Sequence, residues 1–219
     1  GELQLSANMS IAGGTLTLAE ASGFNLNNDV TVTSNRALSF GTLEMNNRNF
    51  TVTTSEGADL ILKKAFTLKT GSTLEMNGTD LTFAEVATIA GILEPSGGTM
   101  TFQKGGSVSG TVNSKNSTLA LQTADLVFTG ILQTNGSTNL SGADLLNLSA
   151  GTLEVAGSLT LDDTTTSNNT ILKLTADTTI SRDSLFTLGS ANLAGNTLTL
   201  GSASTDLTID NSAPVEGES

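Results

Sequence analysis

Residues 71–110 read GSTLEMNGTDLTFAEVATIAGILEPSGGTMTFQKGGSVSG, and one pattern of residues occurs twice in this stretch. Leu74 and Leu93 lie 19 positions apart, each directly before a Glu, and Phe83 and Phe102 are separated by the same distance. Alternating polar and apolar residues surround these positions, which indicates short strands with one buried face. A period near 20 residues indicates that the chain repeats one structural unit.

The repeat continues toward the C-terminus as three ladders of apolar positions. The first ladder comprises Leu74, Leu93, Val112, Leu132, Leu153, Leu172 and Leu193. The second comprises Phe83, Phe102, Leu121, Leu140, Leu161, Ile180 and Leu200. The third comprises Ile89, Val108, Phe128, Leu148, Leu188 and Ile209, with the polar Asn168 at one position. Three ladders in phase predict a rod with three faces.

Residues that suit tight corners recur between the strands. Those between the first and second ladders are Gly78, Gly98, Asn116, Gly136, Gly157, Asp177 and Gly195. Those before the first ladder are Gly71, Gly91, Gly110, Gly130 and Gly151. We expect left-handed backbone conformations at the corners between the first and second ladders.

The predicted fold is therefore all-β: a three-sided parallel β-helix, or β-solenoid, with about 20 residues per coil and an expected right hand. One coil cannot bury its apolar residues alone, but stacking places like residues over like about 4.8 Å apart. The alternative is an antiparallel β-sandwich, which also has many short strands. A sandwich has no reason to keep three ladders in phase.

The chain divides into three segments. Residues 71–210 form the regular solenoid, and residues 211–219 lose the pattern and are predicted to be a linker or tail. Residues 1–70 are predicted to form irregular coils with insertions. Within them, residues 13–18 and 41–45 resemble strands of the first ladder, and the insertions are expected near residues 27–29 and 58–62.

Composition argues against several classes of function. The chain has no His and no Cys, which removes the usual catalytic triads and zinc ligand sets, so we expect no enzyme and no cofactor. With 9 basic and 21 acidic residues, the net charge is -12, which disfavours nucleic acid and anionic lipid as partners. No apolar stretch is long enough to predict membrane insertion.

Four acidic residues are the remaining candidates for chemistry. Asp162 and Asp163 are the best local carboxylate pair, since glycosidases use two carboxylates. Asp206 and Asp210 are weak candidates for calcium, which prefers hard oxygen ligands. The simpler interpretation of both pairs is a solvated corner or edge, so we expect no catalytic residue and no metal.

The outward side of the second face carries two ranks of mostly hydroxyl residues. The ligand-face candidates are Thr82, Thr99, Thr101, Thr118, Thr160, Thr179, Thr197 and Thr199. The double rank resembles the Thr-x-Thr ice-binding face of β-solenoid antifreeze proteins, although Asp80, Ala120, Asn139 and Asp177 interrupt it. That resemblance implies a regular ligand such as ice or a polysaccharide. The alternative is that Thr is simply a favourable residue on an exposed strand.

Two further features stand out along the regular region. On the outward side of the first face, Ile92, Ile131 and Ile171 alternate with Thr, and such a stripe can mark a lateral contact. Residues 164–170 replace one strand of the third face by a polar run, which we expect to protrude or to be mobile.

The recurring form Gly-x-Leu-Glu-x-x-Gly-x-Leu-Thr resembles bacterial surface β-solenoids, namely autotransporter passengers and filamentous-haemagglutinin-like adhesins. The resemblance covers about residues 71–210. It implies secretion and display at the bacterial cell surface, as a structural module of an adhesin or self-assembling filament. The expected partners are a second copy or the rest of a larger solenoid, and a host or matrix glycan.

Overall fold

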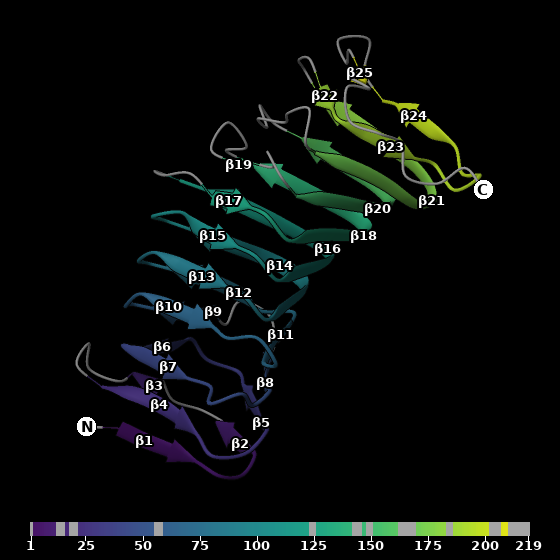
Figure 1. Cartoon of the computed structure of the whole chain (residues 1–219). Coiled ribbons are helices and arrows are strands. Elements are labelled where there is room, and N and C mark those ends of the chain that lie inside the picture. Colours follow the sequence, from purple (N-terminus) through teal and green to yellow (C-terminus); the bar gives the residue numbers. More distant parts are fainter. Residues whose placement is uncertain are drawn as a thin grey trace.

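The described part of the chain is a stack of parallel β-strands (Figure 1). The computed structural model describes residues 2–11, 16–17, 22–54, 59–122, 126–141, 146–147, 151–161, 170–182, 186–201 and 207–209. Within these ranges every strand pairing is parallel, the partners lie 19–24 residues apart, and no helix occurs. The predicted β-solenoid is confirmed.

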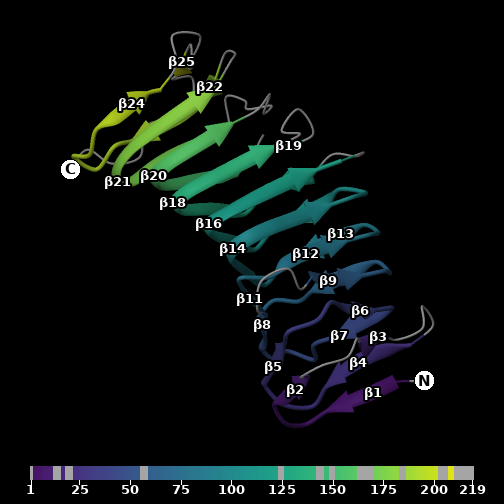
Figure 2. The ribbon, with the colours of Figure 1, turned by 180° about the vertical axis from the view of Figure 1, so that it is seen from behind.

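The first and second faces are joined in one large sheet. Strands of the first face are β2 (Met9–Ile11), β5 (Val30–Ser34), β8 (Phe50–Thr54), β11 (Thr73–Asn77) and β23 (Ser190–Asn192). Strands of the second face are β3 (Leu16–Thr17), β6 (Leu38–Phe40), β9 (Asp59–Leu62), β12 (Asp80–Phe83) and β24 (Leu198–Leu200). Long strands that contribute to both faces are β14 (Ile92–Phe102), β16 (Thr111–Leu121), β18 (Ile131–Ser141), β20 (Thr152–Leu161) and β21 (Ile171–Arg182). Figure 2 shows these long strands crossing the stack one above another.

The third face consists of three separate ladders of short strands. The first ladder is β1 (Glu2–Leu5), β4 (Gly23–Leu26) and β7 (Thr42–Glu44). The second is β10 (Phe66–Leu68), β13 (Ala87–Ile89), β15 (Gly106–Val108), β17 (Leu126–Phe128) and β19 (Leu146–Asn147). The third is β22 (Phe186–Leu188) with β25 (Leu207–Ile209).

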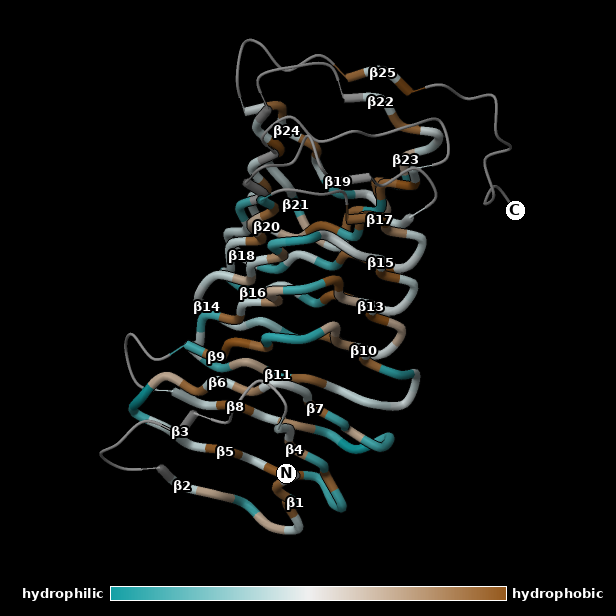
Figure 3. The backbone as a smooth tube through the Cα atoms, turned by 90° about the vertical axis from the view of Figure 1, so that its left-hand side faces the viewer, coloured by the Kyte–Doolittle hydropathy of each residue, from teal (hydrophilic) through white to brown (hydrophobic). Residues whose placement is uncertain are grey.

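The apolar columns stack in register. Leu93 pairs with Val112, and Val112 pairs with Leu132, and all three side chains are fully buried. The tube coloured by hydropathy shows apolar segments recurring at the same place in successive turns (Figure 3). The columns at Leu74 on the first face and at Ile89 on the third therefore form as predicted over most of their length.

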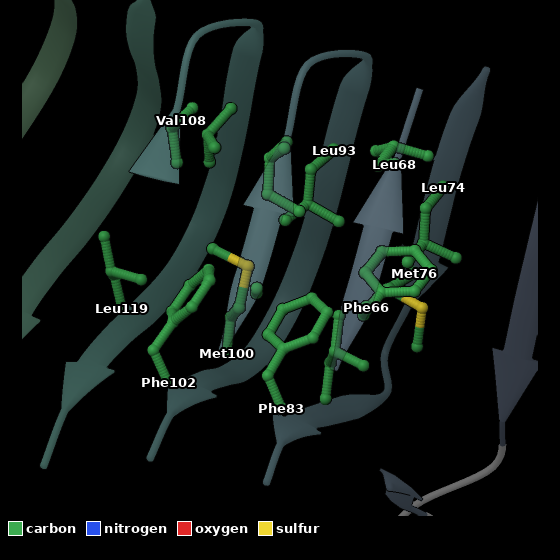
Figure 4. Packing of buried hydrophobic residues seen from close by; sticks show 14 of the residues in the cluster. Phe66, Leu68, Leu74, Met76, Phe83, Leu93, Met100, Phe102, Val108 and Leu119 are labelled. Atoms are coloured by element: carbon green, nitrogen blue, oxygen red, sulfur yellow. The ribbon is translucent and has the colours of Figure 1, made fainter. Parts of the chain in front are cut away.

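Aromatic rings extend the core across the turns (Figure 4). The ring centroids of Phe83 and Phe102 lie 4.7 Å apart, and those of Phe66 and Phe83 lie 5.5 Å apart. Stacked rings at such spacings contribute about 0.5–1.5 kcal/mol beyond burial of their area. Met76 and Met100 lie in the same cluster and are buried.

The described residues up to position 70 form turns of the same solenoid, and three details predicted for this region are wrong. Strand β7, within residues 41–45, belongs to the third face, since Leu43 pairs with Phe24. Strand β3, within residues 13–18, pairs with β6 on the second face. Strand β9, within the predicted insertion near 58–62, is a core strand, because Leu60 pairs with Leu81 and both are buried. The first and second faces cross residue 70 without a break, since β8 pairs with β11 and β9 pairs with β12, whereas on the third face β7 and β10 belong to separate ladders.

Two ladders also differ from prediction toward the C-terminus. Leu172 pairs with Ala191, while Leu193 is 40% exposed and lies outside the column. On the second face Leu140 pairs with Leu119 instead of Leu121. The register shifts arise at two corners, where the later strand gains residues relative to the earlier one. Leu148, Asn168 and the tail at 211–219 lie outside the described residues.

The corner residues act in two different ways. Positive φ angles occur at Gly78, Gly98, Asn116, Gly136, Gly157 and Gly195, as predicted, and not at Asp177. Gly110 and Gly130, in the second series, do not have positive φ. These two positions need glycine because there is no room for a side chain between the turns. A Cβ on Gly130 would lie 2.0 Å from the carbonyl oxygen of Gly110, and a Cβ on Gly110 would lie 2.1 Å from the carbonyl oxygen of Gly91.

Candidate functional site

The predicted Thr positions all lie on the outward side of the second face. Their side chains are half-buried or exposed, and none is buried in the core. Strands β12, β14, β16, β20, β21 and β24, with the bend before β24, position them by the ordinary alternation of a strand. The predicted orientation is therefore confirmed for the whole set.

The two Thr ranks are not straight. Thr82 pairs with Thr101, and Thr101 pairs with Ala120, but Asn139 pairs with Thr118. A second shift makes Thr179 the partner of Ser158, two residues from the predicted neighbour Thr160. Each predicted rank is therefore offset along its length, which weakens the match to a regular lattice such as ice.

The predicted acidic sites fall in undescribed segments. Asp162, Asp163, Asp206 and Asp210 lie outside the described residues. Among the residues that the structure describes, no group of three or more His, Cys, Asp and Glu side chains is placed to hold a metal ion.

Asp59 and Asp80 form a pair that the sequence pattern does not reveal. They are in-register neighbours on β9 and β12, both on the outward side of the second face. Burial raises the pKa of Asp59, and the adjacent charge of Asp80 raises it further. Asp80 has a structural role, since its Oδ1 accepts a hydrogen bond of 2.6 Å from the backbone N–H of Thr99. The pair is a source of local repulsion.

The outward side of the first face carries the predicted Ile stripe. Its column runs in register from turn to turn through Thr73, Ile92, Thr111, Ile131, Thr152 and Ile171. Ile92 and Ile171 are 42% and 45% exposed. The alternation of Thr and Ile is therefore a real surface feature.

A second outward column on the same face is charged and amide-bearing. We call it the polar column: Glu75, Glu94, Asn113, Gln133, Glu154 and Lys173, each one residue after a position of the first ladder. Side chains of neighbouring turns bond to each other, since Asn113 Nδ2 donates to Glu94 Oε1 at 3.1 Å. Its constant offset from the first ladder is the sequence signal that could have identified it.

Glu154 is the centre of the polar column. Its Oε1 accepts a hydrogen bond of 2.8 Å from Lys173 Nζ, and its Oε2 accepts one of 2.7 Å from Gln133 Nε2. The hydrogen bond from Lys173, followed by that from Gln133, lowers the pKa of Glu154. Glu154 is therefore an ionised, well-held carboxylate at neutral pH, which suits positioning better than proton transfer.

A hollow of about 240 Å³ lies beside this column. It is lined by Asn113, Lys115, Gln133, Thr134, Asn135, Glu154, Ala156 and Thr175, from β16, β18, β20 and β21. Its polar groups are amides, one ammonium group, hydroxyls and one carboxylate. Such groups bind and orient a ligand through hydrogen bonds and offer no activated nucleophile.

Fold and surface together define a β-solenoid protein with polar outward columns. No family model matches the chain, and comparisons with the curated proteins and with the solved structures found no match either. Among the described residues, no helix has the length and apolar character needed to cross a membrane.

Proposed function

We propose that this chain is a structural and display module of an extracellular bacterial adhesin or filament, which stacks end to end with another solenoid segment. The stacked segment is either a second copy or a further part of the same polypeptide. The resemblance to surface β-solenoids supports this proposal, together with a surface dominated by hydrogen-bonding groups.

The observation that carries the proposal is the state of the apolar columns at both ends of the stack. Leu3 is 40% exposed, although its partner Phe24 is fully buried. At the other end Ile209 is 46% exposed beside the fully buried Leu188. One more coil on either end would cover these side chains, and solenoids generally need such a cover.

The unpaired backbone groups of the outermost strands are a second reason to expect stacking. The outermost strands of a parallel stack present backbone N–H and C=O groups that template pairing with another chain. Among the described residues no helix lies over β1 at one end or β25 at the other. End-to-end pairing would satisfy these backbone groups and bury the exposed leucine and isoleucine at the same time.

Sedimentation velocity and electron microscopy of the isolated chain test the proposal. We expect concentration-dependent rods of several solenoid lengths, and their loss in the double variant Leu3→Asp, Ile209→Asp. The matched control is the double variant Ile92→Asp, Ile171→Asp, which places the same two charges on exposed positions along the side of the rod and should leave assembly intact. A wild-type chain that stays a single short rod at about 1 mM would exclude stacking on a second copy.

Localisation has its own test. In the source cell, protease added to intact cells should remove the protein, as expected for a molecule displayed outside. Complete protection in intact cells, with cleavage after lysis, would exclude surface display.

A further inference from the structure

The hollow on the first face has unused hydrogen-bonding capacity. Within the described residues, the ammonium group of Lys115 and the amide of Asn135 have no hydrogen-bond partner, and both side chains are exposed. They are neighbours on adjacent turns, since Lys115 pairs with Asn135 across β16 and β18. Two free polar groups therefore face the same hollow.

Two other amides that line the hollow, on the same two strands, are already ordered. Gln133 is fixed by its bond to Glu154, and Asn113 by its bond to Glu94. Each of these two amides donates from its nitrogen, which leaves its carbonyl oxygen as an acceptor. The hollow thus presents both donors and acceptors on side chains that their neighbours hold in place.

We propose that this hollow binds one ring of a neutral saccharide chain. Sugar hydroxyl groups both donate and accept, so they match a wall of carboxamides with one ammonium donor. Lys173 pairs with Glu154, so the Lys115 ammonium is the one unpaired charge among the lining residues, and a net charge of -12 repels an acidic polymer at long range. Neutral hydroxyl groups therefore fit better than carboxylates or phosphates.

Size and shape limit the ligand further. The hollow of about 240 Å³ is smaller than the roughly 300–1,000 Å³ of typical small-molecule sites. It accommodates a single ring, while the rest of the chain would lie along the face. None of the lining residues is aromatic, so no ring stacking adds to the hydrogen bonds, and we expect an affinity on the order of 1 mM.

Ligand-observed NMR with neutral and acidic oligosaccharides tests this site. The neutral probes are cellohexaose, maltohexaose and the N-acetylglucosamine hexamer, and the acidic probe is an oligogalacturonate. We expect binding of at least one neutral probe, and an affinity lowered about fivefold or more in Lys115→Ala and Asn135→Ala, since each removes about one hydrogen bond. Ala156→Phe, which fills the hollow, should abolish binding.

Two control variants keep the test specific. Asn77→Ala changes the same outward column two turns earlier, outside the hollow, and Lys104→Ala removes a lysine that pairs with Glu85. Both should bind like the wild type. The proposal is wrong if no neutral probe binds at about 10 mM, if only the acidic probe binds, or if the hollow variants bind normally. Assembly through the ends does not involve these side chains, so either proposal can fail alone.

Discussion

The Asp59 carboxylate lowers the stability of the folded state at neutral pH. Its pKa is raised by burial and by Asp80, so the folded state holds its proton more tightly than the unfolded state does. This group therefore costs stability as pH rises from the unfolded pKa through the folded pKa, and the cost is fully present at neutral pH. The same carboxylate is harmless in acid, where both states are protonated.

Replacing Asp59 by Asn should therefore stabilise the protein at neutral pH. We expect the free energy of unfolding to rise by about 0.5 kcal/mol near pH 7, a figure reduced for solvent screening. The gain should disappear below about pH 3, where the carboxylate is neutral. Urea titrations at both pH values measure it, and Asp80→Asn should not reproduce the gain in full, because that variant loses the acceptor for Thr99. An equal gain at both pH values would contradict this account.

Gly130 is required by the distance between turns and not by its φ angle. Gly130→Ala would place a Cβ 2.0 Å from the carbonyl oxygen of Gly110, whereas Gly151→Ala would place one 3.2 Å from that of Gly130. Overpacking of this kind costs about 1–3 kcal/mol. We expect Gly130→Ala to lower the free energy of unfolding by an amount in that range and Gly151→Ala by clearly less. Urea unfolding of both variants checks the order, and equal effects would show that the close approach is not the cause.

At the scale of the strands, the sequence predicts spacing better than register. Each strand of the second face offers two inward positions, such as Leu119 and Leu121, and either one keeps an apolar residue in the core. A shift by two residues therefore leaves the alternation unchanged, so the pattern alone could not detect it. The first ladder was easier to predict because in three successive turns the second inward position is Pro95, Ser114 or Thr134, which leaves Leu93, Val112 and Leu132 as the aliphatic ones.

For the candidate site, too, the sequence predicts the orientation of side chains but not which side chains of neighbouring turns meet. The outward orientation of the Thr residues follows from period-2 alternation and was predictable. The hollow depends on which side chains of neighbouring turns meet, and this depends on the register at the corner between the first and second faces. The outward faces are therefore predictable from the sequence, whereas the hollow between neighbouring outward columns is not.

The corner strands also bury hydroxyl groups with unequal partners. Thr134 Oγ1 is buried without a hydrogen-bond partner, whereas Thr178 Oγ1 donates to the carbonyl oxygens of Ala176 and Val155 at 2.9 and 3.2 Å. An unpaired buried hydroxyl costs about 1–3 kcal/mol, which Val of the same shape avoids. We expect Thr134→Val to stabilise the protein by about 1 kcal/mol and Thr178→Val to destabilise it. Thermal unfolding of the two variants measures both changes in stability. A loss of stability in both would contradict the claim that the Thr134 hydroxyl is unpaired.

At the scale of the whole molecule, the negative net charge of the rod opposes end-to-end association through its exposed apolar side chains. A net charge of -12 on every copy gives long-range repulsion, while the exposed Leu3 and Ile209 give only short-range attraction on contact. The Debye length falls from about 30 Å at 0.01 M salt to about 8 Å at 0.15 M, so added salt weakens the repulsion far more than the apolar contact. End-to-end association should therefore strengthen as NaCl rises from about 0.01 to 0.3 M, and sedimentation velocity at fixed protein concentration measures the shift. The double variant Leu3→Asp, Ile209→Asp should remain dispersed throughout this range. Association that weakens with salt would instead indicate that ion pairs, and not apolar coil ends, join the copies.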